Sequence, residues 1–245
     1  SDNHGATSTV DLTITVTGTN DAPVAVVEPD VAAQEGGVTI GGILASTDAD
    51  ISGTTASYAQ VGAVDGVTIL SDGTWSFDPT HSSYDYLAQG ETLDVTVTWN
   101  VTDDQSAVSS DSSFTITVTG TNDAPVAVAD SNTTAENSLL NVAAASGVLI
   151  NDTDLDTSDS HSVSAVAGVS GNVGSAVAGD NGGSFNIAAD GSYSFTPGSD
   201  FDYLAVGETA DTKVSYTVSD NHGATSTVDL TITVTGTNDA PVAVA

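Results

Sequence analysis

The sequence predicts an all-β chain made of tandem sandwich domains, and three observations support this fold class. Apolar and polar residues alternate with a period of two, as in VDLTITVT at residues 10–17. β-Branched residues are plentiful, and Gly and Asp punctuate the chain at short intervals. A sequence unit also returns, because residues 1–26 recur letter for letter as residues 219–244. A repeat this faithful is typical of a tandem array of modules.

The repeated unit closes with GTND, which begins at Gly18, Gly120 and Gly236. A diverged copy of the closing segment occupies residues 102–128. Since these marks stand about a hundred residues apart, one unit has the size of a small domain. We expect the following division: 1–22, the C-terminal fragment of a preceding repeat; 23–122 and 125–241, two full repeats; and 242–245, the start of the next repeat.

Strand and turn signals follow the same order in the two full repeats. Asp72-Gly73 and Asp190-Gly191 predict tight hairpins, because Asp-Gly readily supplies the positive φ angles of such turns. The alternating segments that follow place Trp99 and Tyr216 at one core position. Seven or so short strands in about a hundred residues favour an Ig-like sandwich, although the Cys-Trp-Cys marks of true immunoglobulin domains are missing.

The repeats meet at NDAP sequences that cover residues 20–23, 122–125 and 238–241. A single Pro without a Gly-Ser tract predicts a short, stiff linker.

Charge excludes several classes of partner. The chain has 33 acidic residues and one basic residue, Lys213, for a formal net charge of −32. Such a chain repels nucleic acid and anionic membrane surfaces. No apolar run is long enough to insert into a membrane, and no signal-peptide pattern opens the sequence. Without Cys, disulfides cannot brace the repeats, and small domains in that position often use a metal.

The acidic residues recur at corresponding places in both repeats. Paired sets, first repeat then second, are Glu35 with Glu136; Asp48 and Asp50 with Asp152, Asp154 and Asp156; Asp85 with Asp202; Glu91 with Glu208; Asp103 and Asp104 with Asp220 and Asn221; and Asn122-Asp123 with Asn238-Asp239. Carboxylates are hard oxygen donors, and six to eight oxygens suit Ca²⁺. The alternative is that Asp and Asn simply occupy turns, where they bond their own backbone.

An EF-hand is excluded. Counted from Asp152, the loop would place Thr157 at its sixth position and Val163 at its twelfth, where Gly and Glu are required. Any Asp-x-Asp pair must therefore find its other ligands in distant parts of the fold.

Nothing in the chain indicates an enzyme. His4 and His222 lie in the duplicated SDNHGATS turn, where the first repeat has Gln105. No base, nucleophile and orienting group recur together in the two repeats. We therefore expect no catalytic residues.

The closing sequence VTGTNDAPVAV resembles the signature of VCBS repeats in giant bacterial adhesins of the RTX type, which are exported by type I secretion. The ordered set of an early Glu, TDAD, FDYL and NDAP also resembles a cadherin repeat. In cadherins these elements clamp Ca²⁺ between successive domains. NDAP lacks the second Asn of the cadherin linker, and Glu91 and Glu208 stand six residues past their Asp.

The resemblance implies one complete interdomain Ca²⁺ site, drawn from Glu35, Asp85, Glu91, Asn122, Asp123, Asp152, Asp154, Asp156 and Asp220. It also implies two half-sites, empty or weakly filled. One would comprise Asp21 with Asp48, Asp50 and Asp103, and the other Asp239 with Glu136, Asp202 and Glu208.

These observations favour an extender. We expect Ca²⁺-stiffened repeats at the extracellular surface of a bacterium, which space a distal adhesive domain from the cell in adhesion or biofilm formation. The partners are neighbouring repeats of the same chain, and other domains of the parent protein would contact a glycan or surface ligand. The alternative is that the repeats themselves bind a glycan or protein ligand. Joint exposure of Tyr84, Tyr86 and Tyr203 would favour that alternative.

Overall fold

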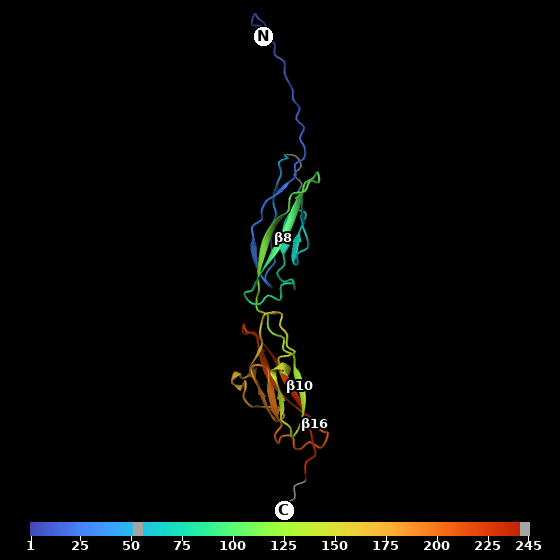
Figure 1. Ribbon diagram of the computed structural model, residues 1–245, viewed down its shortest axis with the longest axis vertical. Coiled ribbons are helices and arrows are strands. Elements are labelled where there is room, and N and C mark those ends of the chain that lie inside the picture. Colours follow the sequence, from blue (N-terminus) through green and yellow to red (C-terminus); the bar gives the residue numbers. More distant parts are fainter. Residues whose placement is uncertain (51–55, 241–245) are drawn as a thin grey trace, which may run out of the picture. The chain divides into compact units, whose positions relative to one another are not determined.

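The computed structural model describes residues 1–50 and 56–240 of the chain (Figure 1). Its elements are nearly all β-strands, with only two short 3₁₀ turns, Ala144–Ser146 and Ser170–Asn172, among the described residues. The all-β fold class predicted from the sequence is therefore confirmed. Residues 241–245, which include the expected start of the next repeat, lie outside the described residues.

The first repeat contributes two main sheets. One has the strand order β2-β9-β8-β5, the other has the order β3-β7-β6, and β1 pairs with β4. The strands are β1 Val24–Ala25, β2 Val31–Gln34, β3 Ile40–Ile43, β4 Ser46–Thr47, β5 Ser57–Gln60, β6 Val67–Ile69, β7 Thr74–Phe77, β8 Thr92–Thr102 and β9 Ser112–Thr119.

The second repeat has the same plan. Its sheets have the orders β10-β17-β16-β12 and β11-β15-β14-β13. The strands are β10 Asp130–Ala135, β11 Leu140–Val142, β12 Ser162–Val166, β13 Val177–Ala178, β14 Ser184–Ile187, β15 Tyr193–Thr196, β16 Thr209–Ser219 and β17 Thr225–Thr235.

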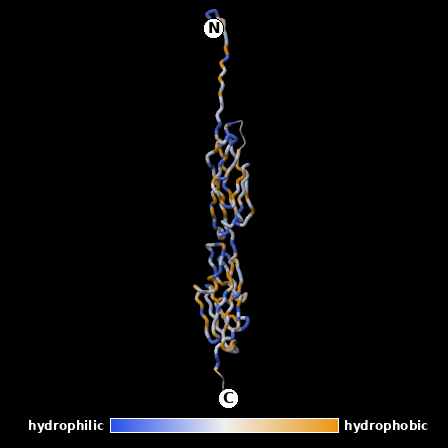
Figure 2. The backbone as a smooth tube through the Cα atoms, turned by 90° about the vertical axis from the view of Figure 1, so that its right-hand side faces the viewer, coloured by the Kyte–Doolittle hydropathy of each residue, from blue (hydrophilic) through white to orange (hydrophobic). Residues whose placement is uncertain are grey.

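Strand alternation places the core as the sequence predicts. From Thr212 in β16 and from Leu230 in β17 every second residue is buried, and the hydropathy of the backbone tube alternates along the strands in Figure 2. Phe185 of β14, Tyr216 of β16 and Ile232 of β17 are fully buried in one cluster, so the two sheets of the second repeat form a sandwich. Trp99 and Tyr216 are both 0% exposed, which fits their expected equivalence.

A parallel strand pair places an acidic residue at one end of each sandwich. β2 runs parallel to β9, and β10 runs parallel to β17, whereas the other strand pairs of the described residues are antiparallel. Glu35 directly follows β2, and Glu136 directly follows β10. Each therefore lies beside the end of the strand that leads into GTND.

The chain divides into two compact units that cut across the first repeat. Unit 1 comprises Ser1–Asp30, Ile40–Phe77 and Thr96–Thr115, and unit 2 comprises Val31–Thr39, Asp78–Val95 and Ile116–Ala245. The repeat boundaries at 23–122 and 125–241 therefore stay a prediction from the sequence. One end of the first repeat and the whole second repeat belong to unit 2, so the acidic residues around Asn122 can be described within it.

Within unit 1, the first 22 residues form no strand (Figure 1). Val10 and Leu12 are 93% and 85% exposed, although the identical sequence is half-buried in β17. In the described part of the chain, no helix has the length and hydrophobicity needed to cross a bilayer.

Candidate metal centre

Five chain segments of unit 2 bring carboxylates toward Asn122. Glu35 follows β2, Asp85 lies in the turn after β7, and Asp123 follows β9. The loop before β12 carries Asp154 and its neighbours, and Asp220 follows the end of β16. All five segments are loops or strand ends, where a rigid sandwich can present polar side chains without disturbing its core.

Glu35 is the buried centre of the first group. It is 5% exposed, and its Oε2 accepts a hydrogen bond of 2.9 Å from the backbone N–H of Thr121. Burial raises the pKa of Glu35, the Thr121 bond opposes this, and the charges of Asp123, Asp156 and Asp85 raise the pKa further. Four carboxylates therefore share one electrostatic environment.

Asp156 links this group to the loop before β12. It is 1% exposed, and its Oδ2 accepts the Asp123 N–H at 2.8 Å. Its Oδ1 is buried without a hydrogen-bond partner among the described residues. Burial raises the pKa of Asp156, the Asp123 bond opposes this, and nearby carboxylates, Asp123 first, raise the pKa again. A buried oxygen of this kind is costly unless a cation neutralises it.

A second group lies around Asp220. Asp154, Asp159 and Asp220 each offer a carboxylate oxygen, and these oxygens lie within 4.8 Å of one another. Asp220 Oδ2 accepts from Asn122 Nδ2 at 3.0 Å, while its Oδ1 accepts backbone N–H groups, including that of His222 at 2.8 Å. Burial alone would raise the pKa of Asp220, but these hydrogen bonds outweigh it and lower the pKa.

The expected half-site in unit 1 repeats this hydrogen-bond pattern. Asn20 Nδ2 donates to Asp103 Oδ2 at 2.8 Å, as Asn122 donates to Asp220. The Asp21 N–H donates to Asp50 Oδ2 at 2.8 Å, as Asp123 donates to Asp156. Asp50 N–H in turn donates to Asp48 Oδ1 at 2.9 Å. The structure therefore brings all four of these predicted residues together.

The second expected half-site is open. Glu136 is 1% exposed and accepts from the Thr237 hydroxyl at 2.8 Å, while its Oε2 has no partner among the described residues. Asp202, Asn238 and Asp239 line a cavity of about 540 Å³ at the same end of the sandwich.

Three predicted residues lie differently. Glu91 Oε2 accepts the Ala88 N–H at 3.2 Å, and Glu208 Oε2 accepts the Ala205 N–H at 2.9 Å, so both close their own turns. Asp152 holds the Val128 N–H at 2.8 Å, and burial, with the charge of Asp130, raises its pKa. The structure thus equates Asp48 and Asp50 with Asp154 and Asp156, while Asp152 faces Asp130.

Asp159 and His161 were not predicted as site residues from the sequence. The predicted set held acidic residues that recur in both repeats, and the segment after Asp50 has no acidic counterpart of Asp159. The signal that could have found them is the difference between the repeats. Residues 152–161, DTDLDTSDSH, contain more residues of the types that bind metals than the corresponding residues 46–55, STDADISGTT.

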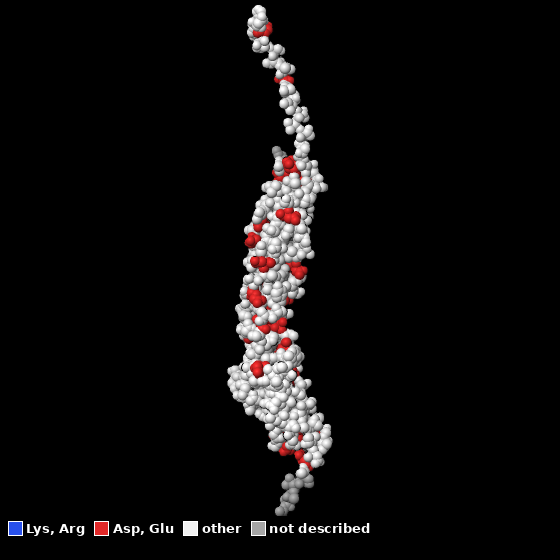
Figure 3. Space-filling view, in the orientation of Figure 1, with Lys and Arg blue, Asp and Glu red and all other residues white. Residues whose placement is uncertain are grey.

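The chain offers little positive charge to this centre. Its one basic residue, Lys213, pairs with Asp229 across β16 and β17 at 2.7 Å. On the face drawn in Figure 3, acidic side chains are spread over the surface and no Lys or Arg is visible. No Lys or Arg among the described residues therefore neutralises these carboxylates.

Hard oxygen donors dominate the candidate centre, and two of them, Asp156 Oδ1 and Asn122 Oδ1, are buried without a hydrogen-bond partner among the described residues. This donor set and these orphaned atoms fit Ca²⁺, which accepts carboxylate and amide oxygens.

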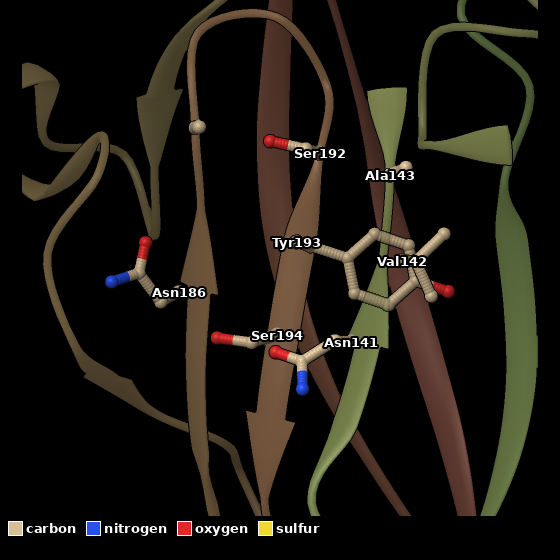
Figure 4. Close-up of a pocket in the computed structure, with 8 residues that line it drawn as sticks. Asn141, Val142, Ala143, Asn186, Ser192, Tyr193 and Ser194 are labelled. Atoms are coloured by element: carbon tan, nitrogen blue, oxygen red, sulfur yellow. The ribbon is translucent and has the colours of Figure 1, made fainter. Parts of the chain in front are cut away.

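The tyrosines that could mark a ligand-binding face are not exposed together. Tyr84 is 3% exposed, whereas Tyr86 and Tyr203 are 40% and 70% exposed and come from separate turns. A polar depression of about 480 Å³ lies instead on the second repeat, where Asn141, Ser194 and Asn186 are cross-strand neighbours on β11, β15 and β14 (Figure 4).

Comparisons with known families agree with this architecture. Residues 122–236 match the model of a bacterial cadherin-like domain, and residues 20–119 match that of a bacterial Ig domain. The two matched segments are therefore similar to bacterial cadherin-like and Ig domains, which are typically structural or adhesion modules and not enzymes. Cadherin-like domains are generally extracellular and generally bind Ca²⁺. No curated protein matches the chain.

Similar solved structures are cadherin ectodomains. The human desmocollin-1 ectodomain is 13% identical over 90% of this chain and 42% of that chain, with a TM-score of 0.47. Drosophila N-cadherin EC1-4 is 15% identical over 89% and 51%, with a TM-score of 0.32. Mouse protocadherin-24 EC1-3 is 17% identical over 88% and 70%, with a TM-score of 0.47. The chain thus spans about half or less of the first two.

Proposed function

We propose that this chain is a Ca²⁺-stiffened extender region of a bacterial surface adhesin. The observation that carries the proposal is the buried, unpartnered Asp156 Oδ1 among like-charged neighbours, which supports a bound cation. Glu35, Asp85, Asp123 and Asp156 would hold Ca²⁺ in the first group. Asn122, Asp154 and Asp220 border the second group. The ion, when bound, supplies the positive charge that this acidic chain lacks.

The protein's own part in stiffening is to position these carboxylates before any ion arrives. Backbone N–H groups of Thr121 and Asp123 already hold one oxygen each of Glu35 and Asp156. The second oxygens remain available to a cation. Since like charges that are not neutralised repel one another, we expect the linker around Asn122 to loosen in chelator and to become rigid in Ca²⁺.

The wider setting is part of the same proposal. An acidic, Cys-free, repetitive chain suits the extracellular surface of a bacterium, and the VTGTNDAPVAV signature supports a VCBS-type RTX adhesin exported by type I secretion. Its partners would be neighbouring repeats, and a distal domain of the parent protein would contact the glycan or surface that is bound in adhesion or biofilm formation.

The test combines thermal unfolding with small-angle scattering, in excess Ca²⁺ and in chelator. Ca²⁺ should raise the melting temperature and narrow the distribution of particle lengths, and Asp156→Asn should weaken both effects. Asp190→Asn is the matched control, because Asp190 lies in an exposed hairpin where it accepts the Ser192 N–H at 3.0 Å. Unchanged melting and scattering on addition of Ca²⁺ would overturn the proposal.

A second candidate function is glycan binding by the repeat itself. The polar depression in Figure 4 favours it, because Asn141, Asn186 and Ser194 present amides and a hydroxyl side by side. The first repeat has Gly41, Ser76 and Thr68 in the corresponding cross-strand row. A glycan array probed with the chain and with Asn141→Gly would test this candidate, since binding unaffected by the substitution excludes the depression.

A further inference from the structure

Three residues near Asp220 distinguish the second repeat from the first. Asp159, His161 and His222 all lie beside the second acidic group of unit 2. When the repeats are aligned on Asp50 with Asp156 and on Asp103 with Asp220, the residues at the corresponding sequence positions are Gly53, Thr55 and Gln105. The second repeat thus has one carboxylate and two imidazoles near this acidic group that the first repeat lacks at the corresponding positions.

The added carboxylate is buried and incompletely bonded. The Asp159 side chain is 1% exposed, and its Oδ2 has no hydrogen-bond partner among the described residues. Its carboxylate lies within 4.8 Å of those of Asp154 and Asp220. Three carboxylates this close repel one another when charged, and a cation that joins them would relieve that repulsion, as would protonation of the two imidazoles beside them.

The two imidazoles approach this group from different elements. His161 Nε2 lies 3.1 Å from Asp154 Oδ2, and His222 Nε2 lies 3.5 Å from Asp159 Oδ1. Neighbouring ligands of one tetrahedral Zn²⁺ ion, with bonds of about 2.1 Å, lie about 3.4 Å apart. Each imidazole therefore lies at a distance from its own carboxylate that suits adjacent ligands of a small divalent ion, whereas the ligand atoms within 4.8 Å of one another are those of Asp154, Asp159 and Asp220.

The type of donor selects the type of metal. Ca²⁺ and Mg²⁺ take oxygen ligands, whereas imidazole nitrogen favours Zn²⁺ and other first-row transition metals. A hydrogen bond explains the 3.1 Å contact of His161 equally well, but the 3.5 Å contact of His222 is long for one. Asp220 is left out of the proposed ligand set, because both of its carboxylate oxygens already accept hydrogen bonds from the protein.

We propose that Asp154, Asp159, His161 and His222 form a mixed nitrogen and oxygen site for a divalent transition metal of the Zn²⁺ class. This inference deepens the proposed function. It rests on the proposed function at one point, because Asp154 also borders the proposed Ca²⁺ group. One linker would then carry a Ca²⁺ group around Glu35 and Asp156 and a separate transition-metal group, the latter confined to repeats that carry the added residues.

The experiment titrates the metal-free chain with ZnCl₂ by calorimetry and with CoCl₂ by visible absorption, which reports imidazole ligation through the ligand-field bands of Co²⁺. His161→Thr and His222→Gln install the residues of the first repeat. Each should weaken Zn²⁺ binding at least tenfold and diminish the Co²⁺ bands, while CaCl₂ binding stays within twofold of the unsubstituted chain.

The chain supplies its own control. His4 lies in the same SDNHGATS sequence as His222, and its N–H donates to Asp2 Oδ1 at 2.9 Å as that of His222 donates to Asp220. Its segment has no counterpart of Asp159, so His4→Gln should leave the Zn²⁺ affinity unchanged.

The outcomes separate the two proposals. Zn²⁺ affinity that survives both histidine substitutions would overturn the inference, and so would equal losses of Zn²⁺ and Ca²⁺ affinity, which would mean that the imidazoles only orient carboxylates. Histidine-dependent Zn²⁺ binding in a chain that does not bind Ca²⁺ supports the inference and removes the proposed Ca²⁺ function. Asp156→Asn should reduce the Ca²⁺ affinity and leave the Zn²⁺ affinity unchanged, which tests in the opposite direction whether the two metal sites are separate.

Discussion

Replacing Asp156 with Asn should change stability in opposite directions with and without Ca²⁺. In chelator the substitution removes a buried negative charge that has Asp123, Asp154 and Asp159 as neighbours. The amide can keep the Asp123 N–H on its oxygen and donate to a neighbouring carboxylate in place of the unpartnered Oδ1. A hydrogen bond gained in this way is worth on the order of 1 kcal/mol, so the metal-free variant should be more stable by about that amount.

In Ca²⁺ the sign reverses. At a free Ca²⁺ concentration of one hundred times Kd, the ion adds about 2.7 kcal/mol to the stability of the unsubstituted chain. If loss of the charged ligand weakens binding about a hundredfold, the variant keeps only about 0.4 kcal/mol of that increment. The net effect is a loss of about 1.3 kcal/mol, or roughly 3–5 °C in melting temperature for a chain of this length.

Melting curves by circular dichroism, recorded in chelator and in Ca²⁺, measure the change in stability in each condition, with Asp190→Asn as the control. Asp190→Asn should change the melting temperature by the same amount in chelator and in Ca²⁺, because Asp190 is exposed and its hydrogen bonds given by the structure lie within its own hairpin. The reasoning fails if Asp156→Asn destabilises the chain in chelator as much as in Ca²⁺. That result would make Asp156 a structural turn residue with no cation to hold.

Three further predictions concern the rest of the fold. Burial raises the pKa of Glu35, Asp123 and Asp156 above the ordinary values of 4.5 for Glu and 3.8 for Asp, so these carboxyls bind protons more tightly in the folded chain. The metal-free chain should therefore gain stability as the pH falls from neutral toward those values. A series of melting temperatures measured without metal at different pH values checks this. Below pH 3.8 stability should fall again, as carboxyls with a lowered pKa become protonated. Tyr216→Phe removes the 2.6 Å bond to Asp130 and should cost about 1.5–3 kcal/mol in urea unfolding, whereas Tyr203→Phe, at a 70% exposed site, should be silent. Gly236→Ala brings a Cβ against the carbonyl oxygens of Leu204 and Ala205 and should cost about 1–3 kcal/mol, while Gly18→Ala, which meets open space, should leave the melting temperature unchanged.

The sequence predicted the strands well because their pattern is local. Period-two alternation alone identified the buried face of β17, and the Asp-Gly pairs located two hairpins with Gly73 and Gly191 at positive φ. The role of the GTND glycine was not predictable in this way. A Cβ at Gly120 or Gly236 would collide with backbone from a turn more than twenty residues away, and no local pattern reports that approach.

The candidate site was predictable where it repeats. Asn20 with Asp103 and Asn122 with Asp220 form the same bond in separate units, so a pattern common to both repeats found them. Glu91 stays a predicted ligand, and its oxygens accept hydrogen bonds from the Ala88 N–H and from the hydroxyl of Ser158, in the loop that carries Asp156. The turn that Glu91 closes becomes visible only when the backbone path is known.

Repetition as a guide has a physical limit. Residues that both repeats share must serve what both repeats do, which here is burial of a sandwich core and presentation of carboxylates at its ends. A residue that gives one linker a different metal preference is, for that reason, absent from the other repeat. Asp159, His161 and His222 are of this kind, and they lie together although 61 residues separate the two histidines in the chain (His161 to His222). Departures from a repeat that converge in space are therefore the better indication of individual function, and the Zn²⁺ titration of His222→Gln against His4→Gln tests that reasoning at two copies of one sequence.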